Sequence, residues 1–312
     1  MPLRLGLCCA FQEQPIAFRN TTVAATSKLS AELARQKLAA LCQANAQALA
    51  AAIEFCGTSG IGCFRVVSQI LPLKTHPKLG YDLADLPGGE ATIEQFRRCG
   101  RLAKKLGVRT CFHPDQFVVL NSPRPEVVTA SLAELEYQAE VADWIGADVV
   151  NIHGGGVFGD KTVALARFAK NLGRLSDRAR SKLTVENDDK LFTPADLLSI
   201  CLQTGIPLVY DVHHHRCHPD GLSVEEATAE ARATWNREPL FHISSPAGGW
   251  QAPRPEIHAE LINVADFPPS WLGQDLTVEI EARGKEVAVR QLAGDLAKLA
   301  KPKARRRSAR SC

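Results

Sequence analysis

The stretch Val149-Val-Asn-Ile-His153-Gly-Gly-Gly156 begins as a hydrophobic, strand-like run and ends on a histidine before a glycine-rich turn. Five further runs have the same form, in which a short apolar segment closes on a residue that can bind a metal. These runs are Thr110-Cys-Phe-His113-Pro, Leu183-Thr-Val-Glu186-Asn, Leu208-Val-Tyr-Asp211-Val-His-His214-His, Leu240-Phe-His242-Ile-Ser-Ser and Leu276-Thr-Val-Glu-Ile-Glu281-Ala. Structural histidines do not normally recur with this regularity, so the pattern indicates a shared site.

Strand-like and helix-like segments alternate along the whole chain. Strand-like runs start near Arg4, Cys63, Arg109, Asp148, Leu183, Pro207, Leu240 and Asp275. Helix-like stretches cover 30–54, 91–106, 126–145, 161–176, 194–203, 223–236, a short one near 258–264, and 285–300. Strict βα alternation repeated eight times predicts a (β/α)8 TIM barrel, which typically has about 250 residues. The alternative is an open doubly wound sheet, but no Gly-x-Gly-x-x-Gly follows the first strand.

The predicted barrel determines where the metal-binding side chains meet. Active sites of this fold form at the C-terminal ends of the strands. Every ligand-type residue in the six runs falls at that end of its strand, which the barrel hypothesis did not require. We therefore predict an α/β TIM barrel with a metal site at one mouth.

Composition sets the domain organisation. The chain has 312 residues, is 45% hydrophobic and carries a net charge of only +3, which is too small to argue for any partner. We expect a single barrel domain over 1–300. Residues 301–312 hold six basic residues and no acid, which predicts a disordered tail. Such a tail can track a phosphate backbone electrostatically or simply aid solubility.

Ten cysteines do not form a recognisable disulfide framework. Cys8, Cys63, Cys111 and Cys201 lie inside apolar runs, and there is no Cys-x-x-Cys pair. We expect reduced thiols and a cytoplasmic protein. The N-terminus is apolar too briefly for a signal peptide, and no run approaches the ~20 apolar residues of a membrane span.

The residue types in the six runs limit the chemistry. Neutral imidazole with carboxylate suits Zn, Mn or Fe, and the lack of thiolate argues against a purely structural zinc site. Glu186 can bridge two ions, and His214 with His258 can hold a third. Clustered cations neutralise a phosphodiester and activate water, so phosphodiester hydrolysis gains most from this site.

Other polar residues near these runs are open to more than one interpretation. His213 and His215 are weaker ligand candidates than His214, and one of them can instead hydrogen-bond to a metal ligand. Cys217 and His218 form either a local metal clip or a loop cluster without function. His76, just beyond the second strand, can be a ligand, a phosphate contact or a turn residue.

Four runs in order resemble a known family. They are His113-Pro-Asp-Gln-Phe-Val-Val-Leu-Asn-Ser-Pro123, Asn151-Ile-His-Gly-Gly-Gly-Val-Phe-Gly-Asp-Lys161, Thr184-Val-Glu-Asn-Asp-Asp-Lys190 and Tyr210-Asp-Val-His-His-His215. They resemble the UV damage endonuclease family, which is related to the endonuclease IV and xylose isomerase-like barrels. The resemblance extends from about residue 4 to 300.

The resemblance implies a metal-dependent DNA repair enzyme. Such enzymes nick the strand on the 5′ side of pyrimidine dimers, 6-4 photoproducts and some abasic sites, and leave a 3′-hydroxyl. It implies three divalent metals, with Mn²⁺ the usual one and Zn²⁺, Co²⁺ or Mg²⁺ as alternatives. The implied ligands are His113, His153, Glu186, Asp211, His214, His242, His258 and Glu281. Among them we assign catalysis to Glu186, His242 and Glu281; the last is preferred to Glu279 because Glu281-Ala-Arg-Gly-Lys-Glu286 resembles the family's final motif.

The resemblance also implies damaged double-stranded DNA as the partner, and we expect the enzyme to be a monomer. Gln116 and Phe117 would probe the duplex, because an amide offers base-edge hydrogen bonds and a ring stacks. His76 and Lys161 are further expected DNA contacts.

The chain departs from the family at three positions expected around the site. Leu7 stands where the family usually has a tyrosine, and Phe11 where a polar residue is expected. Leu240 replaces a lysine that some members have. These departures put the lesion spectrum in question more than the hydrolysis. A metal-dependent sugar isomerase or epimerase is the rival enzyme, but it normally needs only one or two metals. A non-catalytic DNA- or metal-binding barrel is a third alternative.

Overall fold

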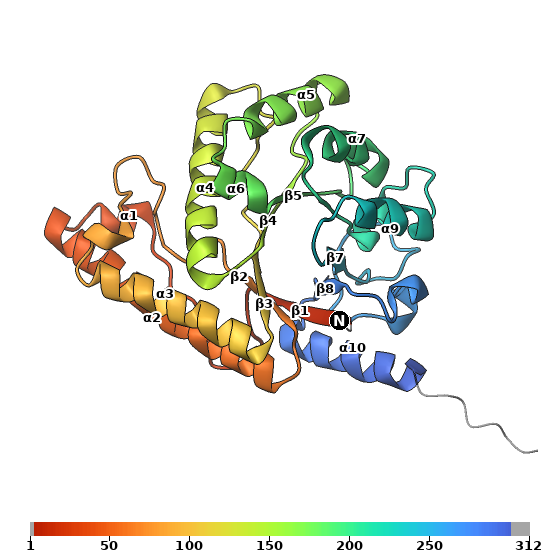
Figure 1. Cartoon of the computed structure of the whole chain (residues 1–312), viewed down its shortest axis with the longest axis horizontal. Helices are drawn as coiled ribbons and strands as arrows, with labels where there is room; N and C mark the ends of the chain where they lie inside the picture. Colours follow the sequence, from red (N-terminus) through yellow and green to blue (C-terminus); the bar gives the residue numbers. More distant parts are fainter. Residues whose placement is uncertain (1–2, 301–312) are drawn as a thin grey trace, which may run out of the picture.

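In the computed structural model of the chain, which describes residues 3–300, eight parallel strands form one sheet (Figure 1). The strands are β1 (Arg4–Cys8), β2 (Cys63–Val66), β3 (Arg109–Phe112), β4 (Val149–His153), β5 (Leu183–Glu186), β6 (Leu208–Val209), β7 (Leu240–Ile243) and β8 (Thr277–Ile280). Their order is β6-β5-β4-β3-β2-β1-β8-β7. The two edge strands meet through a parallel bridge between Asp211 and His242, and the His242 N–H donates to the Tyr210 carbonyl at 3.0 Å. The sheet therefore closes, and the predicted TIM barrel is confirmed.

The alternation of inward- and outward-facing side chains along the strands determines where polar residues enter the barrel interior. Inward-facing Cys63, Cys111 and Leu240 form part of a small apolar cluster in the barrel interior. Because side chains two residues apart share a face, the next inward positions are Arg65, His113 and His242. The interior is thus apolar toward the start of the strands and polar at the end where the active sites of this fold lie.

Helices of very different lengths surround the barrel. The long ones are α2 (Ala31–Thr58), α3 (Gly89–Leu106), α4 (Pro125–Ile145), α5 (Lys161–Leu172), α7 (Pro194–Thr204), α9 (Val224–Ala233) and α10 (Lys285–Ala300). Short helical segments are α1 (Val23–Thr26), α6 (Asp177–Lys182), α8 (Val212–Cys217), η1 (Leu83–Asp85), η2 (Val264–Asp266) and η3 (Pro269–Trp271). Figure 1 shows α2 and α3 side by side against one flank of the barrel.

One predicted helix was too long and another was wrong. The helix expected over 161–176 is α5, which ends at Leu172 with Gly173 as its C-cap; Ser176 then caps the separate helix α6 by accepting the Ala179 N–H. The stretch 258–264 is not helical. His258 instead pairs with Pro246 in an isolated antiparallel bridge, so this part of the chain folds back beside the end of β7.

One helix, α2, is long and apolar enough to cross a membrane by length and composition alone. However, 44% of its most apolar stretch is buried within the protein. Its buried residues include Leu38, Cys42, Leu49 and Ile53, which belong to the main hydrophobic core. This burial is typical of a core helix. All nine cysteines within residues 3–300 are free, and the basic tail lies outside the described residues.

Candidate metal centre

Glu186, at the end of β5, lies at the centre of the barrel mouth and is fully buried. Its Oε2 is 2.9 Å from His113 Nε2 and 2.5 Å from Asn151 Nδ2. Its Oε1 is 3.0 Å from His242 Nδ1 and 3.4 Å from His214 Nδ1. Each oxygen therefore faces its own set of histidines, which is the arrangement a bridging carboxylate requires.

The donor atoms form two groups that share Glu186. In the first, His113, Glu186, His242 and Glu281 each offer one ligand atom, all within 4.8 Å of one another. In the second, Glu186, Asp211 and His214 meet the same limit. The sequence-predicted bridge at Glu186 thus has a geometric counterpart.

The remaining two predicted ligands, His153 and His258, lie beside these groups. The His153 ring is 5.0 Å from that of His113 and 5.9 Å from that of His214. His258 Nδ1 is 3.9 Å from Glu281 Oε2, and its ring is 6.3 Å from that of His214. The structure therefore brings all eight predicted ligands to one mouth.

Two buried polar atoms at the mouth belong to predicted ligands. His153 Nδ1 and Asp211 Oδ2 are buried and have no hydrogen-bond partner among the described residues. Buried polar groups are normally satisfied, so such exceptions need an explanation. A divalent cation would satisfy both, and the donor set of imidazoles and carboxylates suits one.

Contacts behind the ligands orient them. His113 Nδ1 lies 3.1 Å from the Pro114 carbonyl, so its proton sits there and Nε2 is free to face Glu186. Asn187 fixes Asp211 by exchanging two hydrogen bonds of 2.9 Å with its backbone. Asn151 is oriented in turn by Thr184, whose hydroxyl donates to it at 2.9 Å.

The charges at the mouth keep its carboxylates ionised. Burial alone would raise the pKa of Glu186, but the charge of His242 and the hydrogen bonds with His113 and His214 outweigh it and hold that pKa well below its usual range. For His242, burial lowers the pKa, yet the Glu186 carboxylate raises it to about 10. Burial lowers the pKa of His153, which keeps this imidazole neutral and able to bind a metal.

Two charged residues at the mouth were missed as components of the site. Arg65 on β2 and Glu279 on β8 are buried and form an ion pair at 2.5 Å. Alternation could have placed Arg65, which follows inward-facing Cys63 by two residues. Glu279 was considered only as an alternative to Glu281; the two carboxylates share one face of β8, since both contact Arg65. Glu279 also forms a third donor group with Cys63 and Cys111, deeper in the barrel.

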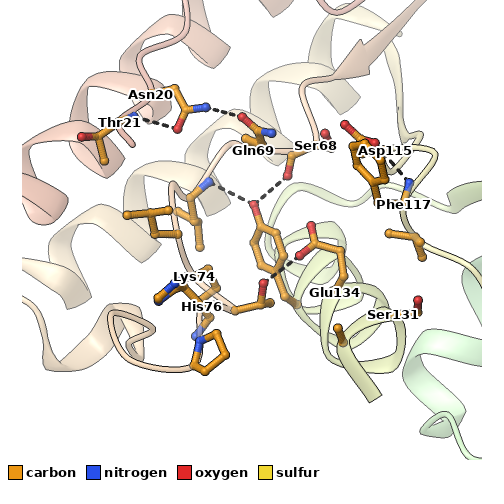
Figure 2. Close-up of a pocket in the computed structure, with 17 residues that line it drawn as sticks. Asn20, Thr21, Ser68, Gln69, Lys74, His76, Asp115, Phe117, Ser131 and Glu134 are labelled. Carbon is orange, nitrogen blue, oxygen red and sulfur yellow. Dashed lines mark hydrogen bonds between the residues drawn. The ribbon is translucent and has the colours of Figure 1, made fainter. Parts of the chain in front are cut away.

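The loop after β3 carries the expected DNA probe. Phe117 is 76% exposed, and its N–H donates to Asp115 at 3.1 Å; Gln116 beside it is also exposed. A cavity of about 450 Å³ adjoins Phe117, and His76 lines its opposite side (Figure 2). His76 Nδ1 accepts two backbone N–H groups, from Lys78 and Leu79, so Nε2 remains able to donate.

Lys161, the last expected DNA contact, has a partner within the protein. It is the first residue of α5, and its ammonium lies 2.7 Å from Asp196 and 5.8 Å from the centre of the Phe192 ring. Asp196 belongs to the capping box of α7. Lys161 thus links two helices on the flank of the barrel.

The three departures do not line the cavity beside Phe117. Leu7 is fully buried in the core that faces the helices, and Leu240 is fully buried in the barrel interior. Phe11 stacks on Phe64 at 5.7 Å and meets Phe55 edge-on. Each of the three therefore packs against apolar neighbours, and Leu240 lies one inward position below His242.

A closed barrel of eight parallel strands with histidines and carboxylates at its C-terminal mouth defines a TIM barrel with a candidate divalent-metal centre. The model of the family described as UV-endonuclease UvdE matches residues 3–309. The chain belongs to this family of DNA repair endonucleases.

Individual relatives agree with the family. The UV DNA damage endonuclease of Deinococcus radiodurans is 34% identical over 303 residues, covering 93% of this chain and 94% of that protein. The enzyme of the same name from Bacillus velezensis is 32% identical, covering 92% and 91%. The crystal structure of SacUVDE superposes with a TM-score of 0.85 at 29% identity, covering 96% of this chain and 100% of that one.

More distant structures share the fold alone. Endonuclease IV from Thermus thermophilus has a TM-score of 0.59 at 20% identity, covering 80% of this chain and 94% of that one. D-psicose 3-epimerase from Clostridium cellulolyticum has a TM-score of 0.55 at 12% identity, covering 95% and 97%. The same barrel therefore occurs in nucleases and in sugar epimerases, and the side chains at the mouth must decide between them.

Proposed function

We propose that this protein uses divalent metals to hydrolyse the phosphodiester on the 5′ side of UV lesions in double-stranded DNA. The substrates are pyrimidine dimers and 6-4 photoproducts, and also abasic sites. Incision leaves a 3′-hydroxyl. Family membership supports the endonuclease, and the observation that carries the metal chemistry is the buried Glu186 carboxylate, whose two oxygens face different histidines.

We propose that the mouth holds three metal ions. His113, Glu186, His242 and Glu281 would hold one ion, and Asp211 with the shared Glu186, in a donor group that also includes His214, would hold a second. His214 with His258 would hold a third, and His153 lies beside the same set. Clustered divalent cations neutralise the phosphodiester, lower the pKa of an attacking water and stabilise the leaving alkoxide. We propose Mn²⁺ as the metal, with Zn²⁺, Co²⁺ or Mg²⁺ as alternatives.

Three residues have the central roles in hydrolysis. Glu186 joins the metal positions, while His242 and Glu281 close the mouth from β7 and the end of β8. Glu186 and His242 are fully buried and Glu281 is mostly buried, so the electrostatic interactions among them are stronger than on an exposed surface.

Recognition would occur on the Phe117 side of the mouth. Phe117 would stack in the gap left by flipped nucleotides, and Gln116 would contact base edges. His76 Nε2–H can donate to a phosphate, whereas Lys161 can do so only by leaving Asp196. A dimer pairs and stacks poorly, so flipping it costs less than flipping intact bases. All the residues in this scheme come from one chain, and we propose that the enzyme acts as a monomer.

A plasmid assay tests the proposal. With Mn²⁺, the purified protein should convert UV-irradiated supercoiled plasmid to the nicked form and leave untreated plasmid intact, and EDTA should abolish the reaction. Equal nicking of both plasmids would refute lesion specificity but not the nuclease. An absence of nicking with Mn²⁺, Mg²⁺, Co²⁺ and Zn²⁺ would refute the nuclease.

Defined oligonucleotides test the finer points. A duplex with a single dimer, 6-4 photoproduct or abasic site, labelled at the 5′ end of the damaged strand, should yield a product that stops before the lesion. A DNA polymerase should extend that product directly, because its end is a 3′-hydroxyl. A product that requires phosphatase treatment before extension would contradict the proposed polarity of bond cleavage.

A further inference from the structure

Glu279 contacts the back of His242, on the side opposite the candidate metal centre. Its Oε2 lies 2.8 Å from His242 Nε2 and accepts two contacts from Arg65, from Nε at 2.8 Å and Nη2 at 2.5 Å. Its Oε1 accepts from the Cys111 thiol at 3.0 Å. Glu279 is only 1% exposed, so its carboxylate makes these contacts out of reach of bulk solvent.

The two nitrogens of His242 face different groups. Nδ1 lies 3.0 Å from Glu186 Oε1 and 3.4 Å from Glu281 Oε1, at the candidate metal centre. Nδ1 can bind a metal only if it carries a lone pair, which requires the proton to be on Nε2. The position of one proton therefore decides whether His242 is a ligand.

Two neighbours compete for Nε2 with opposite effects. Arg65 Nη2, at 3.0 Å, can only donate, so by itself it would favour a bare Nε2 and place the proton on Nδ1. The ionised Glu279 carboxylate can only accept, so it favours a protonated Nε2. Arg65 Nη2 also has acceptors on Glu279 and on Glu281, at 2.5 and 2.7 Å, and does not need His242.

We propose that Glu279 is a positioning residue that keeps the proton of His242 on Nε2 and thereby presents Nδ1 to a divalent metal. The inference rests on the metal centre proposed above. Ligating histidines commonly donate their second N–H to a carboxylate, which fixes the ring and raises its basicity. Leu240, two residues before His242, is apolar and offers no alternative acceptor at this depth.

Metal affinity tests the proposal with three variants and Zn²⁺ as the probe. Glu279→Met keeps an unbranched side chain but removes the acceptor, and it should weaken Zn²⁺ binding by about 10–100-fold in competition with a chelator. Glu279→Gln keeps one carbonyl oxygen for Nε2–H and should lose less. Cys63→Ala, in the same interior layer but without contact to His242, should bind Zn²⁺ like the wild type. Equal loss in Cys63→Ala would mean that the deeper group of Cys63, Cys111 and Glu279 holds the metal, which would overturn the positioning role.

A spectroscopic signature separates positioning from a merely structural role. In ¹⁵N-histidine-labelled, Zn²⁺-loaded wild type, long-range ¹H–¹⁵N spectra should show His242 with a protonated Nε2 and a metal-shifted Nδ1. The opposite assignment would overturn the proposal even if Glu279→Met failed to fold. Unchanged Zn²⁺ affinity in Glu279→Met would overturn it while leaving the metal centre intact. A wild type that binds neither Zn²⁺ nor Mn²⁺ would instead refute the metal centre itself.

Discussion

His242 Nδ1 lies 3.0 Å from Glu186 Oε1, and both side chains are fully buried where β7 and β5 end. The two residues are 56 positions apart in the chain, and the closed barrel alone brings them together. Without a metal, this contact is an ion pair between a carboxylate and an imidazole. With metals bound, the Glu186 carboxylate and His242 Nδ1 would each coordinate a cation through a lone pair.

We expect Glu186→Gln to abolish incision while leaving the barrel folded. Glutamine keeps the shape of the side chain, but one bridging oxygen becomes an amide that cannot bind a cation. Activity should fall by more than about 100-fold and metal content should fall with it, because the change removes the ligand itself and not merely a group that supports a ligand. Plasmid nicking and metal analysis measure these effects. Glu126→Gln, an exposed carboxylate at the start of α4, should change neither. Wild-type turnover in Glu186→Gln would contradict the bridging role.

Phe117→Ala should weaken binding to damaged duplex without changing metal content. Stacking of a base on an aromatic ring contributes about 1–3 kcal/mol, so the dissociation constant should rise about 5- to 150-fold. Fluorescence anisotropy with a dimer-containing duplex measures this change. Leu202→Ala on α7 is a suitable control, since Leu202 is even more exposed than Phe117 but lies away from the mouth. If metal content fell in Phe117→Ala, the assignment of this loop to DNA would be wrong.

Local sequence patterns predicted the strands, and placed the candidate ligands at their ends, for one physical reason. Alternation determines which side chains of a strand face the barrel interior, and the position along the strand determines how close to the mouth they lie. A single run, such as the one that ends at His153, therefore carries this information without the other strands. The helix α8 was not predicted, because Val212 and the histidines after it read as the continuation of a strand. Asp211 starts this helix by accepting the His214 N–H at 2.8 Å, and the same aspartate is a predicted ligand.

The Arg65–Glu279 pair could not be read from local pattern. The two residues are 214 positions apart. Arg65 lies within an apolar run, and Glu279 is two residues from Glu281, which is the better ligand candidate. Only the register of the closed sheet places β8 beside β1 and β1 beside β2, so that these charges meet. Long-range pairing of this kind depends on topology and not on the local sequence.

Asp220→Asn should destabilise the protein in a pH-dependent manner. Burial tends to raise the pKa of Asp220, but hydrogen bonds from the Ala195 and Leu222 N–H groups and from His215 lower it overall. Since the folded pKa lies below the unfolded one, ionised Asp220 stabilises the fold above about pH 4, and this contribution is lost as the pH falls through the folded pKa. The substitution should lower the free energy of unfolding by about 1–3 kcal/mol at pH 7.

Urea unfolding at pH 7, 5 and 3.5 measures this effect, and the difference between wild type and Asp220→Asn should shrink at the lowest pH. Asp177→Asn is the matched control, because the Asp177 side chain is 93% exposed in its ion pair and should shift stability little at any pH. A difference that grew on acidification would contradict the lowered pKa of Asp220. The result also bears on His215, which joins Asp220 to the Tyr210 hydroxyl and so supports the backbone around α8 without acting as a ligand.

Glu286→Ala should loosen the segment that follows β1. The Glu286 carboxylate, fully buried in the first turn of α10, accepts the backbone N–H groups of Gln12 and Glu13 at 2.8 and 2.7 Å. Alanine leaves both donors without this partner, which should cost about 1–3 kcal/mol of unfolding free energy. Limited proteolysis should then cut first in the segment after β1, while metal content stays at the wild-type level, because Glu286 contacts none of the eight predicted ligands.

Arg290→Ala removes only an exposed ion pair to Glu13 and should have little effect. Equal protease resistance in Glu286→Ala and wild type would mean that packing of Phe11 on Phe64 and Phe55 suffices to hold this segment.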